Sequence, residues 1–182
     1  MTMKRWWPAC LIVLACVHPA LAQKNEGEVT LWLQPGLGVA AGSFSNNYGV
    51  GVEYIAQTDY TIRDGTAIGI RASYRLFNTT DESDLPFVKI AQFGIHGKRF
   101  FTPETRLGLY GLLGGGVYWM KQVGPGRSEP DFGGYGGLGL HYQSADKLAF
   151  FGEAVYNNFV SDPSSTGYFS LSVGLSIGLR ED

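Results

Sequence analysis

The sequence YFSLSVGLSIGL at residues 168–179 alternates between two kinds of side chain. Every second residue from Phe169 to Leu179 is apolar, and the residues between them are small or polar. Alternation with a period of two predicts a β-strand with one apolar face. The stretch is longer than the usual strand of about 5–6 residues, whereas a strand that crosses a bilayer needs about 9–11 tilted residues with apolar side chains toward lipid. It therefore predicts one strand of a membrane β-barrel.

Seven earlier stretches alternate in the same way, and turn-forming residues separate them. With the last stretch they predict an all-β fold, an eight-stranded antiparallel up-and-down transmembrane β-barrel. The alternation of the second strand places Tyr48 on the outer face. The predicted strands cover residues 28–41, 48–57, 66–77, 87–101, 106–120, 132–143, 147–158 and 168–179.

The connections between the predicted strands differ in length, and this difference predicts an orientation. Compact turns are predicted at 102–105 and 144–146, and residues 58–65 are predicted to form a turn that ends in the hairpin dipeptide Asp64-Gly65. In barrels of this kind the short turns face the periplasm and the longer loops face outside. We therefore expect both chain termini at the periplasmic side. The loops expected outside the cell are 42–47, 78–86, 121–131 and 159–166.

The N-terminal segment has the layout of a secretory signal peptide. Lys4 and Arg5 precede an apolar run, which leads to the small-x-small cleavage site Ala20-Leu21-Ala22. We predict a signal peptide at 1–22 and a single outer-membrane barrel domain at 23–182. A lipoprotein signal that ends at Cys16 is the alternative.

Composition excludes several other kinds of protein. Both cysteines, Cys10 and Cys16, lie within the predicted signal peptide, so the mature chain has no thiol for a disulfide or a zinc site. Removing the two basic residues of that segment leaves 14 − 2 = 12 basic residues against 16 acidic ones, and no basic run indicates nucleic acid. His96 and His141 have no cysteine or paired carboxylate nearby in the sequence, so we expect neither a metal nor a cofactor.

Two strand-turn-strand patterns point to a family. One runs from Lys98-Arg99-Phe100-Phe101-Thr102-Pro103 into Leu107-Gly108-Leu109-Tyr110, and the other runs from Gly139-Leu140-His141-Tyr142 through Asp146-Lys147-Leu148 to Gly152-Glu153-Ala154. Over about residues 28–179 the chain resembles the eight-stranded barrel domain shared by outer membrane protein A and the opacity-type surface proteins.

The resemblance implies a Gram-negative outer membrane, insertion by the barrel assembly machinery and a structural or surface-interaction role. We expect no enzymatic activity. We expect a monomer in contact with outer-membrane lipid, and any extracellular partner is unknown. Two features depart from the family pattern. The last strand is followed by Arg180-Glu181-Asp182 in place of a terminal aromatic residue, and no peptidoglycan-binding domain follows the barrel.

The predicted register directs polar residues of several strands into the lumen. Charges in so narrow a barrel are tolerated when they are paired or hydrogen-bonded. We therefore predict a polar network that plugs the lumen, with Arg71 at its centre and Glu53 or Glu153 as its partner. Arg106 is also predicted to face inward. The predicted network comprises Gln34, Glu53, Arg71, Arg75, His96, Lys98 and Glu153.

Four alternatives use parts of the same pattern. A proton or ion path would need the same lumen residue types, and a small pore or transporter would use the same barrel. A soluble periplasmic barrel of lipocalin type would turn its apolar faces inward around a ligand. A lipid A deacylase would need His141, Ser144 and Glu153 together, but if residues 144–146 form the turn, His141 lies opposite Ala149 and about 13 Å from Glu153.

Overall fold

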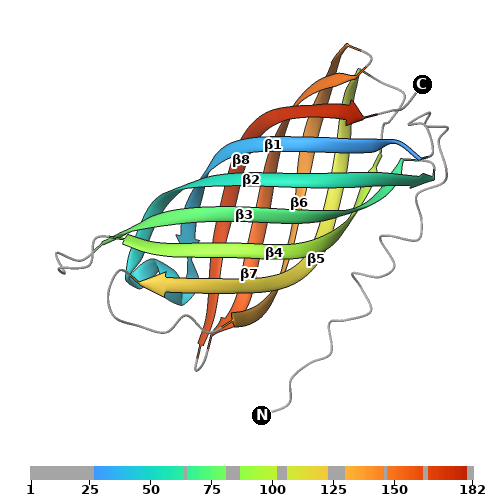
Figure 1. The fold of residues 1–182 in the computed structure, drawn as a ribbon. Coiled ribbons are helices and arrows are strands. Elements are labelled where there is room, and N and C mark those ends of the chain that lie inside the picture. Colours follow the sequence, from blue (N-terminus) through green and yellow to red (C-terminus); the bar gives the residue numbers. More distant parts are fainter. Residues whose placement is uncertain are drawn as a thin grey trace.

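In the computed structural model, eight antiparallel strands form a closed barrel in chain order (Figure 1). The structure describes residues 27–63, 65–80, 87–101, 106–122, 130–145, 147–161 and 164–179. The first strand pairs with both the second and the last, which closes the barrel and confirms the predicted fold class. The elements are β1 (Val29–Ala41), η1 (Gly42–Asn46), β2 (Tyr48–Arg63), β3 (Thr66–Thr79), β4 (Phe87–Phe100), β5 (Leu107–Gln122), β6 (Pro130–Ala145), β7 (Leu148–Ser161) and β8 (Ser164–Leu179).

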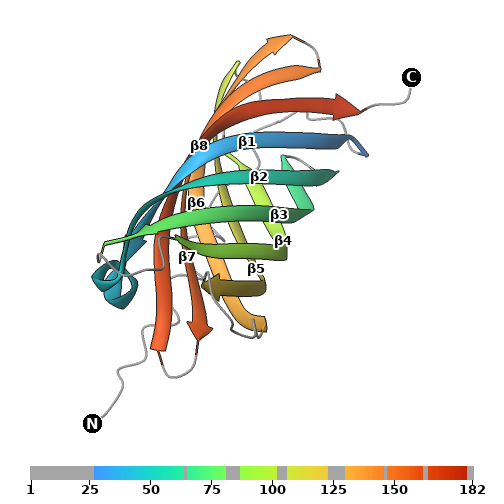
Figure 2. The ribbon, with the colours of Figure 1, turned by 60° about the vertical axis from the view of Figure 1, so that its left-hand side comes forward.

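Two views show how the strands are arranged (Figures 1 and 2). The strands are strongly inclined and wrap around a single lumen. Both ends of the described chain, the start of β1 and the end of β8, lie at one end of the barrel, while η1 lies at the other. We call these the terminal end and the η1 end. Within the described residues no helix has the length and apolar character needed to cross a membrane.

Several strands extend beyond their predicted bounds. The predicted turn at 58–65 is wrong, because β2 continues to Arg63 and its residues pair with β3, Thr61 opposite Ala67. The alternation also continues there, since Tyr60 and Ile62 point outward while Thr61 is buried. Gly65 has a φ of 72°, a value that favours glycine and fits a tight connection.

The predicted loop at 159–166 is also wrong in extent, since Val160 pairs with Ser165 in the hairpin of β7 and β8. Residues 144 and 145 belong to β6, and the outer parts of the predicted loops 78–86 and 121–131 belong to strands. The predicted turn at 102–105 lies outside the described residues, as do residues 81–86 and 123–129. The predicted signal peptide at 1–22 lies outside them too.

The connection between β1 and β2 folds back into the barrel. Residues 42–46 form the short helix η1, and Phe44 is buried against Tyr48 and Phe77, with ring centroids 4.5 and 5.3 Å apart. The expectation that Tyr48 faces outward is therefore wrong. The register of β2 against β3 shifts between Tyr48 and Gly51, so the alternation that holds farther along the strand does not extend back to Tyr48.

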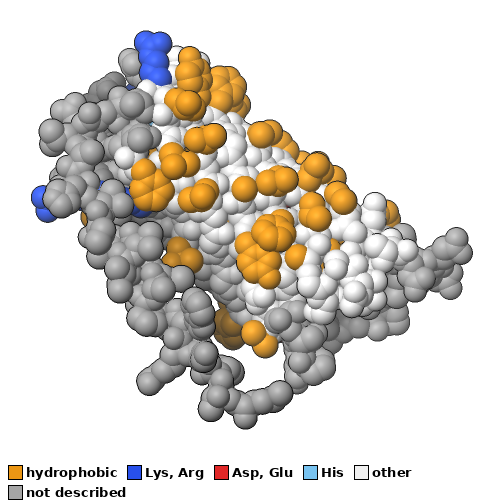
Figure 3. Space-filling view, turned by 180° about the vertical axis from the view of Figure 1, so that it is seen from behind, with side chains coloured by type: hydrophobic (Ala, Val, Ile, Leu, Met, Phe, Trp, Pro, Cys, Tyr) orange, Lys and Arg blue, Asp and Glu red, His pale blue; other side chains and the backbone are white. Residues whose placement is uncertain are grey.

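The outer surface of the barrel is apolar. Large hydrophobic side chains on every strand are exposed, and Ile95, Leu113 and Val173 are each at least 66% exposed. Figure 3 shows such side chains scattered over one face, with Lys and Arg side chains only toward one end of it. An apolar exterior is the reverse of the lipocalin arrangement, in which the apolar faces line the interior.

Small residues make room for large ones inside the barrel. A Cβ atom added at Gly139 would lie 2.2 Å from Cζ of Tyr110, and one at Gly114 would lie 2.5 Å from Cζ of Tyr135. The two tyrosine rings thus occupy the space that side chains at these positions would need. An eight-stranded barrel is just wide enough for side chains to fill it, so glycine on one strand allows a ring from the next to cross the lumen.

Candidate functional site: the polar lumen

The lumen contains all seven residues of the predicted polar network. Each is buried, with at most 4% of its surface exposed. They arrive there by strand geometry, because alternate side chains on each strand point inward and directly paired residues on neighbouring strands meet. Six of them belong to three clusters, which follow one another from the η1 end to the terminal end.

The first cluster surrounds Arg75, which is the paired neighbour of Glu53 on the adjacent strand. The Arg75 Nε atom lies 2.5 Å from Oε2 of Glu53, and the other carboxylate oxygen of Glu53 accepts a hydrogen bond from Ser170. Arg75 Nη1 donates to Ser73 Oγ at 2.7 Å and to Gln92 Oε1 at 3.0 Å. Four strands therefore share one buried ion pair.

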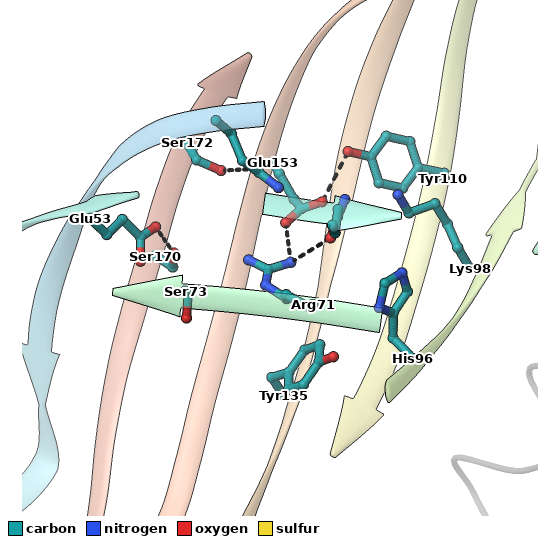
Figure 4. Close-up of polar contacts among 12 residues, drawn as sticks. Glu53, Arg71, Ser73, His96, Lys98, Tyr110, Tyr135, Glu153, Ser170 and Ser172 are labelled. Carbon is teal, nitrogen blue, oxygen red and sulfur yellow. Dashed lines mark hydrogen bonds and ion pairs between the residues drawn. The ribbon is translucent and has the colours of Figure 1, made fainter. Parts of the chain in front are cut away.

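The second cluster crosses the lumen (Figure 4). Arg71 on β3 reaches Glu153 on β7, with Nη1 2.6 Å from Oε1. Tyr110 donates a hydrogen bond to the other oxygen of Glu153 at 3.1 Å, and Arg71 Nη1 also donates to Gln57 at 3.3 Å. The guanidinium carbon lies 5.4 Å from the ring centroid of Tyr135. Of the two predicted partners of Arg71, the structure selects Glu153.

The third cluster is centred on Asp59, which was predicted to lie in the turn at 58–65. The Oδ1 atom of Asp59 lies 2.7 Å from Nε2 of His96, and Oδ2 lies 2.7 Å from Nζ of Lys98. The same ammonium group lies 3.5 Å from the ring centroid of Trp32 and 4.9 Å from that of Tyr110. Asp59 could have been found from the sequence, since the alternation of β2 continues through Tyr60 and Ile62.

The remaining predicted network residue, Gln34, lies apart from the three ion-pair clusters. Its Oε1 atom accepts a hydrogen bond of 2.6 Å from Ser172 on β8. Glu53 and His96 belong to different clusters from Arg71, because Glu53 pairs with Arg75 and His96 pairs with Asp59. The pairing register explains the separation: Glu53 lies opposite Arg75, and Gln57 lies opposite Arg71 four residues along the strand.

The fully charged groups in the described part of the lumen balance. Six buried side chains carry a full charge, three carboxylates and three cations, and each has an oppositely charged partner within 2.7 Å. Burial of charge is tolerated when charges are paired and their remaining groups are hydrogen-bonded. The carboxylates are Glu53, Asp59 and Glu153, and the cations are Arg71, Arg75 and Lys98.

Aromatic clusters lie on both sides of the charged groups. At the η1 end, Phe44, Phe77 and Tyr168 pack with Tyr118 and Phe159, whose rings stack at 4.7 Å. A second set toward the terminal end packs around Trp32, whose ring centroid lies 4.7 Å from that of Phe151. The other members of that set are Phe100, Tyr110, Leu112, Tyr135 and Val155.

Arg106 is not part of the lumen. The prediction that it faces inward is wrong, since Arg106 is exposed and β5 begins one residue later, at Leu107. Its main-chain carbonyl accepts a hydrogen bond from the amide of Gln143. The side chain therefore projects at the rim of the terminal end, where water solvates it.

The structure separates the three residues that a lipid A deacylase would need. His141 is opposite Phe151, not Ala149 as predicted, because β6 continues to Ala145, which pairs with Leu148, so the hairpin lies farther along the chain than residues 144–146. Glu153 is therefore two residues from the position opposite His141, about 7 Å along the strand and about half of the predicted separation. Glu153 is nevertheless bonded to Arg71 and Tyr110, while Ser144 is exposed. Within the described ranges, no three His, Cys, Asp or Glu residues come together in a group suited to a metal.

Comparison with known proteins identifies the fold. No family model matches the sequence, and no curated protein matches it. Solved structures do match. Neisserial surface protein A superimposes with a TM-score of 0.65 at 14% identity, covering 84% of this chain and 99% of the other. The outer membrane protein OprG from Pseudomonas aeruginosa gives a TM-score of 0.59 at 10% identity, with 86% and 97% covered.

A third match is Ail, the attachment invasion locus protein of Yersinia pestis, in complex with the heparin analogue sucrose octasulfate. It gives a TM-score of 0.52 at 20% identity and covers 84% of this chain and 99% of the other. The chain therefore has the fold of the small eight-stranded outer-membrane barrels. This confirms the predicted resemblance at the level of the fold.

Proposed function

We propose that this chain is an outer-membrane barrel with a structural or surface-interaction role, without enzymatic activity and with a lumen closed by its own side chains. The observation that carries the proposal is the inverted distribution of polarity. Ion pairs lie inside the barrel and exposed Ile, Leu, Val and aromatic side chains cover the outside. Contact between so large an apolar surface and water would be unfavourable, whereas the hydrocarbon core of a bilayer is a suitable solvent for it.

The closed lumen is supported by how its charged groups are paired. A conducting path needs groups that water or an ion can approach, but the described charges are engaged with one another and flanked by packed rings at both ends. The competing function is a small pore. A pore would be lined by the same polar side chains, but their ion pairs would first have to separate.

Conductance in planar bilayers separates these two functions. We expect the purified barrel to give no large, steady conductance, because moving an ion past Arg71 and Glu153 requires their ion pair to open in a low-dielectric interior. A porin of known conductance, inserted in the same membrane, serves as the positive control. A large and steady current from this protein would support the pore and count against the closed lumen.

Membrane location has its own test. We expect the protein to sediment with outer membranes and to migrate differently on a gel before and after boiling, since a folded barrel resists unfolding by detergent at room temperature. Protein that stays soluble without detergent would overturn the outer-membrane proposal. Insertion by the barrel assembly machinery, a cleaved signal peptide at 1–22 and a monomeric state belong to the same proposal.

The proposed orientation places the terminal end at the periplasmic side. We expect Ser83→Cys and Ser128→Cys, in the connections after β3 and β5, to react with a membrane-impermeant thiol reagent in intact cells. Thr105→Cys, in the connection after β4, should react only after the outer membrane is broken. Both native cysteines lie in the predicted signal peptide, so the mature chain provides no background. The reverse labelling pattern would show that the orientation is wrong.

The charge of one connection indicates which kind of partner the proposed outer surface would bind. The connection after β3 contains Asp81, Glu82 and Asp84. Ail was solved with a sulfated heparin analogue, which is a polyanion. An acidic loop repels such a ligand, so any partner of this loop in our proposal is a basic surface.

A further inference from the structure

A hollow lies on the outer face of β2 to β5, near the terminal end. Its centre is Gly97, which points outward from β4 and has no atom within 4 Å of the position that a Cβ would take. The register places Ile68 on one side of Gly97 and Leu113 on the other, and Ile95 is the next outward residue of the same strand. Because Gly97 has no side chain, a pit forms among the large apolar side chains around it.

The pit belongs to a groove of about 840 Å³ on this outer face. Ile68, Ile95 and Leu113, which flank Gly97, are 53%, 68% and 67% exposed and so stand clear of the barrel. Gly115, opposite Ile95 on the next strand, extends the floor. The groove therefore combines a smooth glycine floor with aliphatic walls, which suits a flexible hydrocarbon chain better than a flat surface does.

A cation lies at the rim of this groove. Arg99 is the next outward residue of β4 after Gly97, about 7 Å farther toward the terminal end. Its Nη1 atom donates to Thr66 Oγ1 at 2.5 Å, which ties the side chain to the neighbouring strand. Among the described residues no acidic side chain pairs with Arg99, so its positive charge is not neutralised within that part of the chain.

We propose that the groove and Arg99 together bind one anionic phospholipid, in the leaflet that faces the terminal end. An acyl chain fills the pit over Gly97, and Arg99 donates hydrogen bonds to the phosphate while Thr66 holds the guanidinium in place. Arginine suits this role because its planar group donates two parallel hydrogen bonds to a phosphate. This inference rests on the proposed membrane location and adds a specific lipid contact to it.

Two substitutions test the two halves of the site separately. Purified barrel in a neutral detergent is titrated with phosphatidylglycerol or phosphatidylcholine, and the lipid retained per protein is measured by native mass spectrometry. We expect Arg99→Gln to weaken retention of phosphatidylglycerol about fivefold, the loss of one cation's attraction for an anionic lipid, and to remove the preference over phosphatidylcholine. Gly97→Leu, whose Cβ would meet no atom within 4 Å, places a side chain in the pit and should weaken retention of both lipids.

Arg106→Gln is the matched control, because Arg106 is an exposed arginine at the same end that does not neighbour Gly97, Ile68 or Leu113 in the strand register. It should retain both lipids as the wild type does. Equal losses in Arg99→Gln and Arg106→Gln, or unchanged retention in Gly97→Leu, would overturn the lipid site. A barrel that shifts on boiling yet shows no preference for phosphatidylglycerol overturns this inference alone, whereas a protein soluble without detergent overturns the membrane proposal as well.

Discussion

Arg71→Ala is expected to lower the free energy of unfolding of the barrel by about 3–5 kcal/mol, the typical cost of removing one partner from a buried ion pair. The substitution leaves Glu153 in the lumen with only the Tyr110 hydroxyl as a hydrogen-bond donor among its described contacts. An uncompensated carboxylate in this interior must either remain charged without a partner or take up a proton. Urea unfolding in detergent, followed by the gel shift of the folded barrel, measures the loss.

Two further variants decide whether the loss comes from the ion pair. Arg71→Met with Glu153→Gln removes both charges and keeps an oxygen that can accept the Tyr110 hydrogen bond, so most of the stability should return. Arg106→Ala is the matched control: the sequence register predicts it inside, but the structure places it at the rim. Its effect should stay within about 0.5 kcal/mol. An Arg71→Ala barrel as stable as the wild type would contradict the lumen-crossing pair.

The barrel and the faces of most strands followed from the sequence because alternation is a local property. Each inward residue of the predicted network could be assigned from its neighbours alone, as Gln34 between the outward residues Leu33 and Pro35 shows. The same rule failed where a strand departed from ideal geometry. The register shift near Tyr48 reversed the expected face of that residue, and Phe44 fills the lumen from a helix that has no alternation at all.

The partners inside the lumen could not be predicted to the same degree. Which carboxylate meets Arg71 depends on strand tilt and on the register of strands far apart in the sequence, since Glu153 lies across the barrel on β7. When a hairpin register differs by two residues from the predicted one, every residue pair along its two strands changes, as the pairing of His141 with Phe151 shows. The sequence therefore predicted the composition of the lumen better than its connectivity.

Asp59→Ala provides the sharpest test of that corrected geometry, because the two locations of Asp59 predict opposite results. In a surface turn the substitution would change stability by no more than about 0.5 kcal/mol. In the lumen it leaves Lys98 buried over Trp32 without its carboxylate, so we expect a loss of about 3–5 kcal/mol in the same unfolding assay. Adding Lys98→Met removes the stranded charge and keeps an unbranched side chain beside the indole ring. If Asp59 anchors the third cluster, this second substitution restores stability, whereas a further loss would show that Lys98 is held by other groups.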